Sequence, residues 1–200
     1  MKTIFSLIIK ASLTWIVCLM ASGCASTPSS RFYTLSSATA PADTSSTLSV
    51  VVGPVSVPVL VDRPQIVVTT GPNNVLLDEF NRWASPLQNN ISGVVAENLV
   101  ALLGTPRVTL FPQTLSADAD YHIAIEVQSF DSVLGDAASL DAVWTVRRTK
   151  DSRTHTGRTT VREVVQGEGY EALVAAHSRA LDRLSRDIAS ALQMIDRSMQ

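Results

Sequence analysis

YHIAIEVQSF, residues 121–130, is the stretch that decides the fold class of this chain. Apolar residues occupy every second position from Tyr121 to Val127, and the positions between them are mostly polar. Successive side chains of a β-strand point to opposite faces of its sheet. The pattern therefore predicts a strand with one buried and one wet face, as in a sheet that is covered on a single side.

Two segments carry the apolar stripe of a helix that packs on such a sheet. The first begins at Pro86 and ends at Gly104 and Pro106, and the second runs from Gly169 onward. The apolar positions are Leu87, Ile91, Val94, Val95, Leu99, Leu102 and Leu103 in the first, and Leu173, Ala176, Ala180, Leu184, Ile188, Ala191, Leu192 and Ile195 in the second. Because both helices are one-sided, we predict an α+β two-layer sandwich. It has a mixed, largely antiparallel sheet with two main helices on one face.

Shorter patterns supply the remaining strands. We expect single strands at residues 31–35, 48–52 and 107–111, and hairpins that pair 65–70 with 74–80 and 141–149 with 154–165. Pro54 and Pro58 interrupt the valine-rich segment that follows residue 48. Proline lacks the N–H that a ladder needs, so we expect no continuous central strand there, only an edge or surface segment after Val52.

Cys24 follows a leader that resembles a lipoprotein signal peptide. Lys2 and Lys10 precede an apolar segment of about 11 residues, too short to span a bilayer that needs roughly 20. The small residues Ala21, Ser22 and Gly23 stand before Cys24, whereas Val17 stands before the competing Cys18. We predict cleavage before Cys24 and its modification by diacylglycerol and an N-acyl chain such as palmitate.

Composition argues for one exported domain. The 200 residues are 46% hydrophobic and carry 16 basic against 18 acidic side chains, and loss of the leader removes two of the bases. A nucleic-acid partner would need a basic face, so we expect none. We predict a signal peptide at 1–23, a tether at 24–30 and a single α+β domain at 31–200. The tether reaches about 20–25 Å when extended, which keeps the domain close to its membrane.

Motifs of catalysis are missing from the sequence. It has no nucleophile elbow, phosphate-binding P-loop, dinucleotide fingerprint or His-Glu-x-x-His pair. The best cluster is Asp118, Asp120 and His122, which would share a strand face but offers a single histidine for a metal. We interpret it as the wet entry to a strand. We predict no enzyme, no metal and no cofactor besides the lipid on Cys24.

Two segments are candidate interfaces. Six basic residues lie between 147 and 162 against one acid, Asp151, and include Arg158 and Arg162. They could contact lipid headgroups or an acidic partner, or simply keep a solvated hairpin from edge aggregation. In the proline-interrupted segment, Val57 and Val59 could form an exposed apolar interface or pack beneath a loop of the same domain.

With the cysteine placed, several motifs resemble the PqiC (YmbA) family, the auxiliary lipoproteins of ABC-type transport. They are FYTL at 32–35, VGPV at 52–55, DRPQIV at 62–67, RWASPL at 82–87 and AENL at 96–99. Ser85 stands where the family pattern has an acidic residue, so an ion pair that this acid would make is not expected here. Asp62 and Arg63 could pair beside a proline-fixed turn, while Trp83 caps the core. Of these residues, Trp83 fits a core anchor better than a partner contact.

The resemblance implies a non-catalytic docking role at the periplasmic face of the outer membrane, in a system that moves lipids or other hydrophobic molecules between membranes. The implied partners are a periplasmic protein with mammalian-cell-entry (MCE) domains, its inner-membrane components, membrane lipid and copies of the same chain in a homo-oligomeric ring. Ala25 after the cysteine, by resemblance to enterobacterial sorting, also favours the outer membrane. Two alternatives stay open: an assembly lipoprotein of another envelope machine, and a lipid-anchored hydrolase.

Overall fold

The computed structural model describes residues 28–37, 39, 46–112 and 119–197. The expected leader, Cys24 and Asp118 lie outside these residues. The strands are β1 Arg31–Tyr33, β2 Val50–Ser56, β3 Gln65–Gly71, β4 Asn74–Trp83, β5 Val108–Leu110, β6 Tyr121–Val133, β7 Ala137–Arg148 and β8 Thr154–Val164. The helices are α2 Leu87–Leu103 and α3 Gly169–Arg197.

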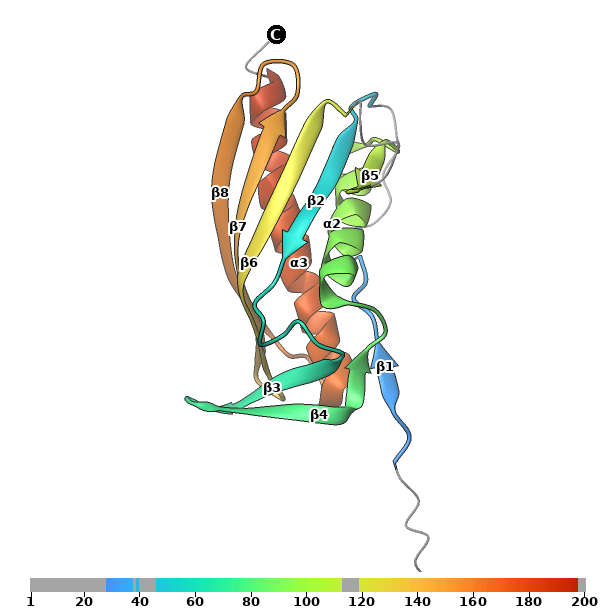
Figure 1. Ribbon diagram of the computed structural model, residues 1–200, viewed down its shortest axis with the longest axis vertical. Coiled ribbons are helices and arrows are strands. Elements are labelled where there is room, and N and C mark those ends of the chain that lie inside the picture. Colours follow the sequence, from blue (N-terminus) through green and yellow to red (C-terminus); the bar gives the residue numbers. More distant parts are fainter. Residues whose placement is uncertain (1–27, 38, 40–45, 113–118, 198–200) are drawn as a thin grey trace, which may run out of the picture.

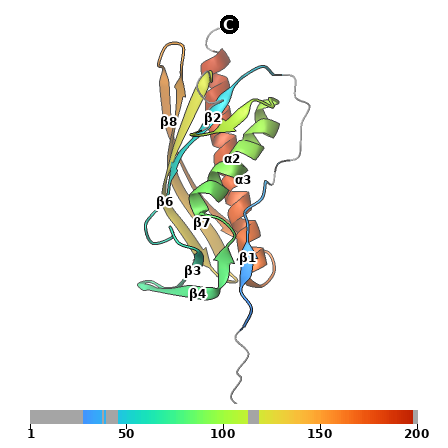
Figure 2. The same cartoon turned by 45° about the vertical axis from the view of Figure 1, so that its right-hand side comes forward.

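The larger sheet has the strand order β5-β2-β6-β7-β8. Strand β2 is parallel to β5 and β6, whereas β6, β7 and β8 are antiparallel neighbours. Along β6 the apolar residues from Tyr121 to Val127 are buried and their neighbours are more exposed, as the alternation predicts. Helices α2 and α3 lie side by side on the buried face (Figures 1 and 2). The α+β class and the two-helix layer are therefore confirmed.

The prediction of a single sheet is wrong. Strands β3 and β4 form a separate three-stranded sheet with β1, in the order β1-β4-β3. The cause is a bend in β4 after Asp78, whose carboxylate accepts hydrogen bonds from the Phe80 and Asn81 amides at 2.8 and 3.0 Å. The bend shifts the register with β3 and turns the end of β4 toward β1.

Strand β2 also differs from expectation, because it continues through Pro54. It is flanked on both sides only at Val50–Val52, where β5 pairs with it. At Gly53 and Pro54 its register with β6 shifts, and pairing resumes at Val55. Pro54 therefore occupies a bulge beyond the end of β5, where its missing N–H breaks no ladder on that side.

A long β6–β7 hairpin is absent from the sequence-based expectations. Its turn lies at Leu134–Asp136, where Gly135 has a φ of 70° and the Asp136 amide donates to the Val133 carbonyl at 3.1 Å. Positive φ favours glycine at this position. Strand β7 begins with two alanines, Ala137 and Ala138, and alanine has a low strand propensity. Pairing with both neighbouring strands therefore determines the conformation of this segment.

Both helices begin and end close to their predicted limits. Gly104 closes α2 in the left-handed conformation, with its amide on the Val100 carbonyl. Between the helices, the Asn98 amide group donates to the buried Ser185 hydroxyl at 3.1 Å. This pair fixes the relative position of α2 and α3 within an otherwise apolar core.

Trp144 on β7 joins the sheet to α3. Its ring lies over Gly157 of β8, where an added Cβ would come within 2.2 Å of the indole. Its Nε1 donates to the Thr159 hydroxyl at 3.0 Å, and that hydroxyl donates to Asp187 of α3 at 2.8 Å. Glycine at 157 is therefore required by close packing.

Candidate functional site

The motifs at 62–64 and 83–86 meet at one pocket, although some twenty residues of sequence separate them. The Trp83 amide donates to the Pro64 carbonyl at 2.7 Å, and the next amide, of Ala84, donates to the Tyr33 carbonyl at 2.8 Å. The first bond holds the two motifs side by side, and the second ties them to β1. The resulting cavity of about 370 Å³ is lined by Asp62, Arg63, Pro64, Trp83, Ala84, Ser85 and Pro86. We call it the motif pocket.

Trp83 is the rigid wall of the motif pocket. It is 5% exposed and packs edge-on against Phe130 of β6, with ring centroids 6.3 Å apart. Its side chain thus caps the end of the core where the chain enters α2. Burial to this degree fits the expected core anchor.

Arg63 supplies a hydrogen-bond donor without an acceptor to the motif pocket. Its Nε is buried and has no hydrogen-bond partner in the described chain. The expected pair with Asp62 is wrong, because no ion pair joins them among the described residues and Asp62 instead accepts from the Gln88 side chain at 3.4 Å. A buried donor without a partner costs roughly 1–3 kcal/mol, so Arg63 favours an acceptor from outside the chain.

Helix α2 begins at the same pocket. Its N-cap is Pro86, which makes no side-chain cap bond, and its first turn contains no acidic residue. The first amides of a helix are unpaired and carry partial positive charge. Arg63 and the start of α2 thus offer hydrogen-bond donors to the motif pocket, while Asp62 adds one negative charge to its lining.

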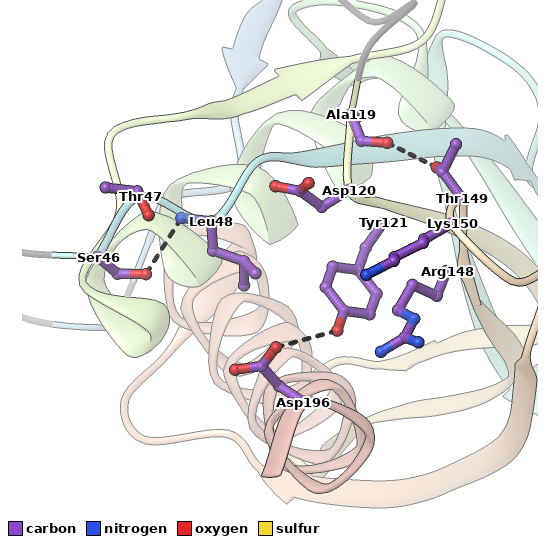
Figure 3. Close-up of a pocket in the computed structure, with 10 residues that line it drawn as sticks. All are labelled: Ser46, Thr47, Leu48, Ala119, Asp120, Tyr121, Arg148, Thr149, Lys150 and Asp196. Carbon is purple, nitrogen blue, oxygen red and sulfur yellow. Dashed lines mark hydrogen bonds between the residues drawn. The ribbon is translucent and has the colours of Figure 1, made fainter. Parts of the chain in front are cut away.

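A larger pocket of about 600 Å³, which was not predicted from the sequence, lies at the far end of the molecule (Figure 3). Tyr121 of β6, Arg148 of β7 and Asp196 of α3 meet there. The Tyr121 hydroxyl donates to Asp196 at 3.3 Å, and Arg148 donates to Asp151 through two bonds of 2.9 and 2.6 Å. Burial and the nearby Asp196 carboxylate raise the pKa of Tyr121. These polar side chains are paired with one another.

Two arginines of the basic β7–β8 hairpin are neutralised by acids that cross-strand register brings close. Arg158 forms a two-bond ion pair with Asp141, and Arg162 pairs with Asp136 at 2.5 Å. The Arg158 bond holds the pKa of Asp141 below its usual value. Arg158 and Arg162 therefore lie on the outer face with their charges already matched.

The two candidate interface valines, Val57 and Val59, lie in different environments. Val57 is half-buried and packs against the main core, whereas Val59 is 86% exposed. Val59 and Leu60 stand in the connection that leads into β3, next to a hairpin with several further exposed apolar side chains. The valine segment is thus divided between core packing and surface.

A comparison with models of protein families identifies the family that has this arrangement of motifs. The model of the ABC-type transport auxiliary lipoprotein component matches residues 33–189, which contain the motif pocket and nearly all of the folded domain. The chain belongs to this family. The resemblance read from the motifs is confirmed. Family membership makes the chain a transport-associated lipoprotein of a cell-envelope membrane.

Solved structures of similar fold extend the comparison. A crystal structure described as an uncharacterized protein has a TM-score of 0.67 and 20% identity over 82% of this chain and 99% of its own. Protein XCC0632 from Xanthomonas campestris, of family DUF330, has a TM-score of 0.66 and 19% identity over 86% of this chain and 100% of its own. At these identities the likeness shows the fold alone. No curated protein is a significant match in sequence.

One buried pair of this family member resembles a catalytic dyad. The Ser132 hydroxyl and His177 Nε2 are 2.8 Å apart, and burial lowers the pKa of His177 to about 3. His177 is fully buried beneath Phe130, whose ring stacks on it at 3.9 Å, and its Nδ1 has no partner. A triad needs substrate access and a group that orients the histidine. The pair has neither in the described chain, so it acts as core packing.

In the described ranges, no three His, Cys, Asp or Glu side chains are placed to hold a metal ion. Asp120 of the expected cluster instead accepts from the Ser49 amide and hydroxyl at 2.9 and 2.6 Å. No helix in the described part of the chain combines the length and apolarity that a membrane crossing needs.

Proposed function

We propose that this chain is the outer-membrane lipoprotein of an intermembrane transport system for lipids or other hydrophobic molecules. It is anchored by acyl chains on Cys24 and docks a periplasmic MCE-domain assembly, without catalysing a reaction itself. Family membership across residues 33–189 supports the transport role. The small residues before Cys24 and Ala25 after it support the anchor and its membrane.

The unpartnered Arg63 Nε in the motif pocket is the observation that carries the docking role. An acidic side chain or a terminal carboxylate of the partner would satisfy this donor and the start of α2 together. Charge-assisted hydrogen bonds of this kind contribute about 1.5–3 kcal/mol, enough to change affinity roughly 10–100-fold. The paired arginines of β8 lack this demand for an acceptor.

Site-specific cross-linking in cells tests the proposal. A photo-cross-linking amino acid at Ser85, on the rim of the motif pocket, is expected to capture an MCE-domain protein. The same amino acid at Val164, 58% exposed on β8, serves as the matched control and is expected to capture none. Arg63→Gln should reduce the Ser85 cross-link about tenfold or more, whereas Arg158→Gln should leave it unchanged.

Three results would contradict the docking role. Capture of the MCE-domain protein from Val164 alone would move the contact to β8. Capture of a protein from another envelope machine at Ser85 would favour the assembly-lipoprotein alternative. An Arg63→Gln chain that is captured as well as the wild type would remove the role of the unpaired donor.

A further inference from the structure

The β3–β4 hairpin exposes apolar side chains next to one another. Val75, Leu76 and Leu77 are consecutive in β4 and are 39%, 49% and 38% exposed, and Phe80 follows at 37%. The facing residues of β3 from Ile66 to Val68 are buried. Successive side chains of a strand point to opposite faces, so Val75 and Leu77 share one face and Leu76 lies on the other. Both faces of the hairpin near its turn are therefore apolar and exposed, as in a segment that contacts another apolar medium.

The same part of β4 is a free sheet edge. Strand β1 pairs with β4 only from Asn81 to Trp83, so among the described residues Asn74–Phe80 has a strand neighbour on one side alone, β3. Asn74–Leu77, next to the turn, contains no charged residue, whereas the acids Asp78 and Glu79 follow it on the same edge. Its unpaired amides and carbonyls need hydrogen-bond partners, which the hydrocarbon of a bilayer does not offer. The headgroup layer supplies water for the backbone and an acyl boundary for the side chains.

The hairpin lies at the end of the molecule that the tether enters. Figures 1 and 2 show it crossing the long axis beside β1, where the chain arrives from the N-terminal side, while α3 ends at the opposite extremity. Cys24 precedes β1 by seven residues, which reach about 20–25 Å at most. An acylated Cys24 therefore keeps this end of the domain close to the lipid.

Side-chain contacts fix the hairpin to the domain. The Tyr170 hydroxyl of α3 donates to Asp78 at 2.7 Å, and the Tyr33 hydroxyl of β1 donates to Asn81 at 2.8 Å. Burial raises the pKa of Asp78, but the bonds from Tyr170, Asn81 and Phe80 outweigh it and keep that pKa below its usual value. The hairpin is thus held across the long axis and cannot fold back over its own apolar side chains without breaking these bonds.

We infer that the β3–β4 hairpin lies on the lipid surface, with Val75, Leu76, Leu77 and Phe80 at the acyl boundary and the β4 edge at headgroup level. The inference rests on the proposed acylation of Cys24. The partner is the bilayer that holds the anchor, so the hairpin orients the domain and directs its opposite end into the periplasm. A second copy of the chain on the same edge is the competing occupant.

Fluorescence of the full lipoprotein in vesicles tests this placement. Cleavage removes Cys18 and acylation blocks Cys24, so a cysteine introduced by Leu76→Cys is the single free thiol for a nitrobenzoxadiazole label. Met194→Cys, 59% exposed near the far end of α3, is the matched control. In vesicles of phosphatidylethanolamine and phosphatidylglycerol, lipid-borne spin labels should quench the label at 76 several-fold more than the label at 194. Its emission should also shift to the blue.

The outcomes separate the hairpin from the anchor. Flotation with the vesicles reports the anchor, and a wild-type chain that fails to float contradicts both the proposed function and the inference. A chain that floats while its two labels are quenched equally overturns the hairpin contact alone. A blue shift at 76 without quenching by lipid also overturns it, because protein then covers the edge. Both variants must keep the cooperative thermal unfolding of the wild type.

Discussion

The two sheets of this molecule differ in how many polar groups lack a hydrogen-bond partner and how many apolar side chains are exposed. On the five-stranded sheet the apolar side chains of β6 and β7 are buried under the helices, and the arginines of β8 are paired with acids of the β6–β7 turn and β7. At the three-stranded end, Arg63 and Arg82 have buried Nε atoms that find no hydrogen-bond partner among the described residues, and β4 exposes four large apolar side chains. The difference teaches that the large sheet supplies stability, whereas the small sheet is prepared for contacts outside the chain.

Truncation of one leucine in each region gives the largest expected contrast in stability. Leu184 of α3 is fully buried in the main core, and Leu76 of β4 is 49% exposed. Leu184→Ala should lower the free energy of unfolding by about 2–5 kcal/mol. Leu76→Ala should lower it by less than about 1 kcal/mol, because little contact is lost. Urea denaturation measures both, and equal losses would contradict the division of roles.

Acid should destabilise the protein through His177, at the boundary between the two regions. Burial lowers the pKa of His177 from 6.5 to about 3, so the unfolded chain binds a proton in this interval that the folded chain does not. Unfolding therefore becomes more favourable as pH falls from 6.5 toward 3. His177→Gln should flatten this part of the pH–stability curve. His155→Gln, at an exposed position, is the control and should leave the curve unchanged. Identical curves for all three chains would show that the pKa of His177 is the same in the folded and unfolded chains.

Replacement of one arginine in each region gives the smallest expected contrast in the free energy of unfolding. The two changes are expected to differ in sign. Arg63→Met removes a donor that has no partner, so stability should be unchanged or slightly higher. Arg158→Met removes an exposed ion pair with Asp141, so stability should fall slightly. Thermal unfolding at low salt measures the two variants. A clear loss of stability in Arg63→Met would show that Arg63 is structural and not a partner contact.

The sequence predicted the layer structure because long periodic segments carry it. The alternation of residues 121–130 and the stripes of α2 and α3 each contain many positions that agree. The separate small sheet was missed because it needs the pairing of β4 with β1, which lies some fifty residues earlier in the chain and leaves no local pattern. The start of β7 was missed because its alanines favour no strand by themselves.

The candidate site was predictable only where its residues are adjacent in sequence. The motifs at 62–64 and 83–86 were recognised, and they line one pocket. The unpaired state of Arg63 was not predictable, since Asp62 stands beside it in sequence but accepts from Gln88 in the fold. The charge of the β7–β8 hairpin was overestimated, because Asp136 and Asp141 reach its arginines only through cross-strand register.

Mass spectrometry of the protein extracted from membranes tests the central claim of a lipid-anchored domain most directly. The account predicts an N-terminal peptide that begins at Cys24 and carries a diacylglycerol and an amide-linked acyl chain. It also predicts that Cys24→Ser abolishes this modification and releases the domain from the membrane fraction. An unmodified thiol at Cys24, or a Cys24→Ser chain that stays equally membrane-bound, would contradict the account.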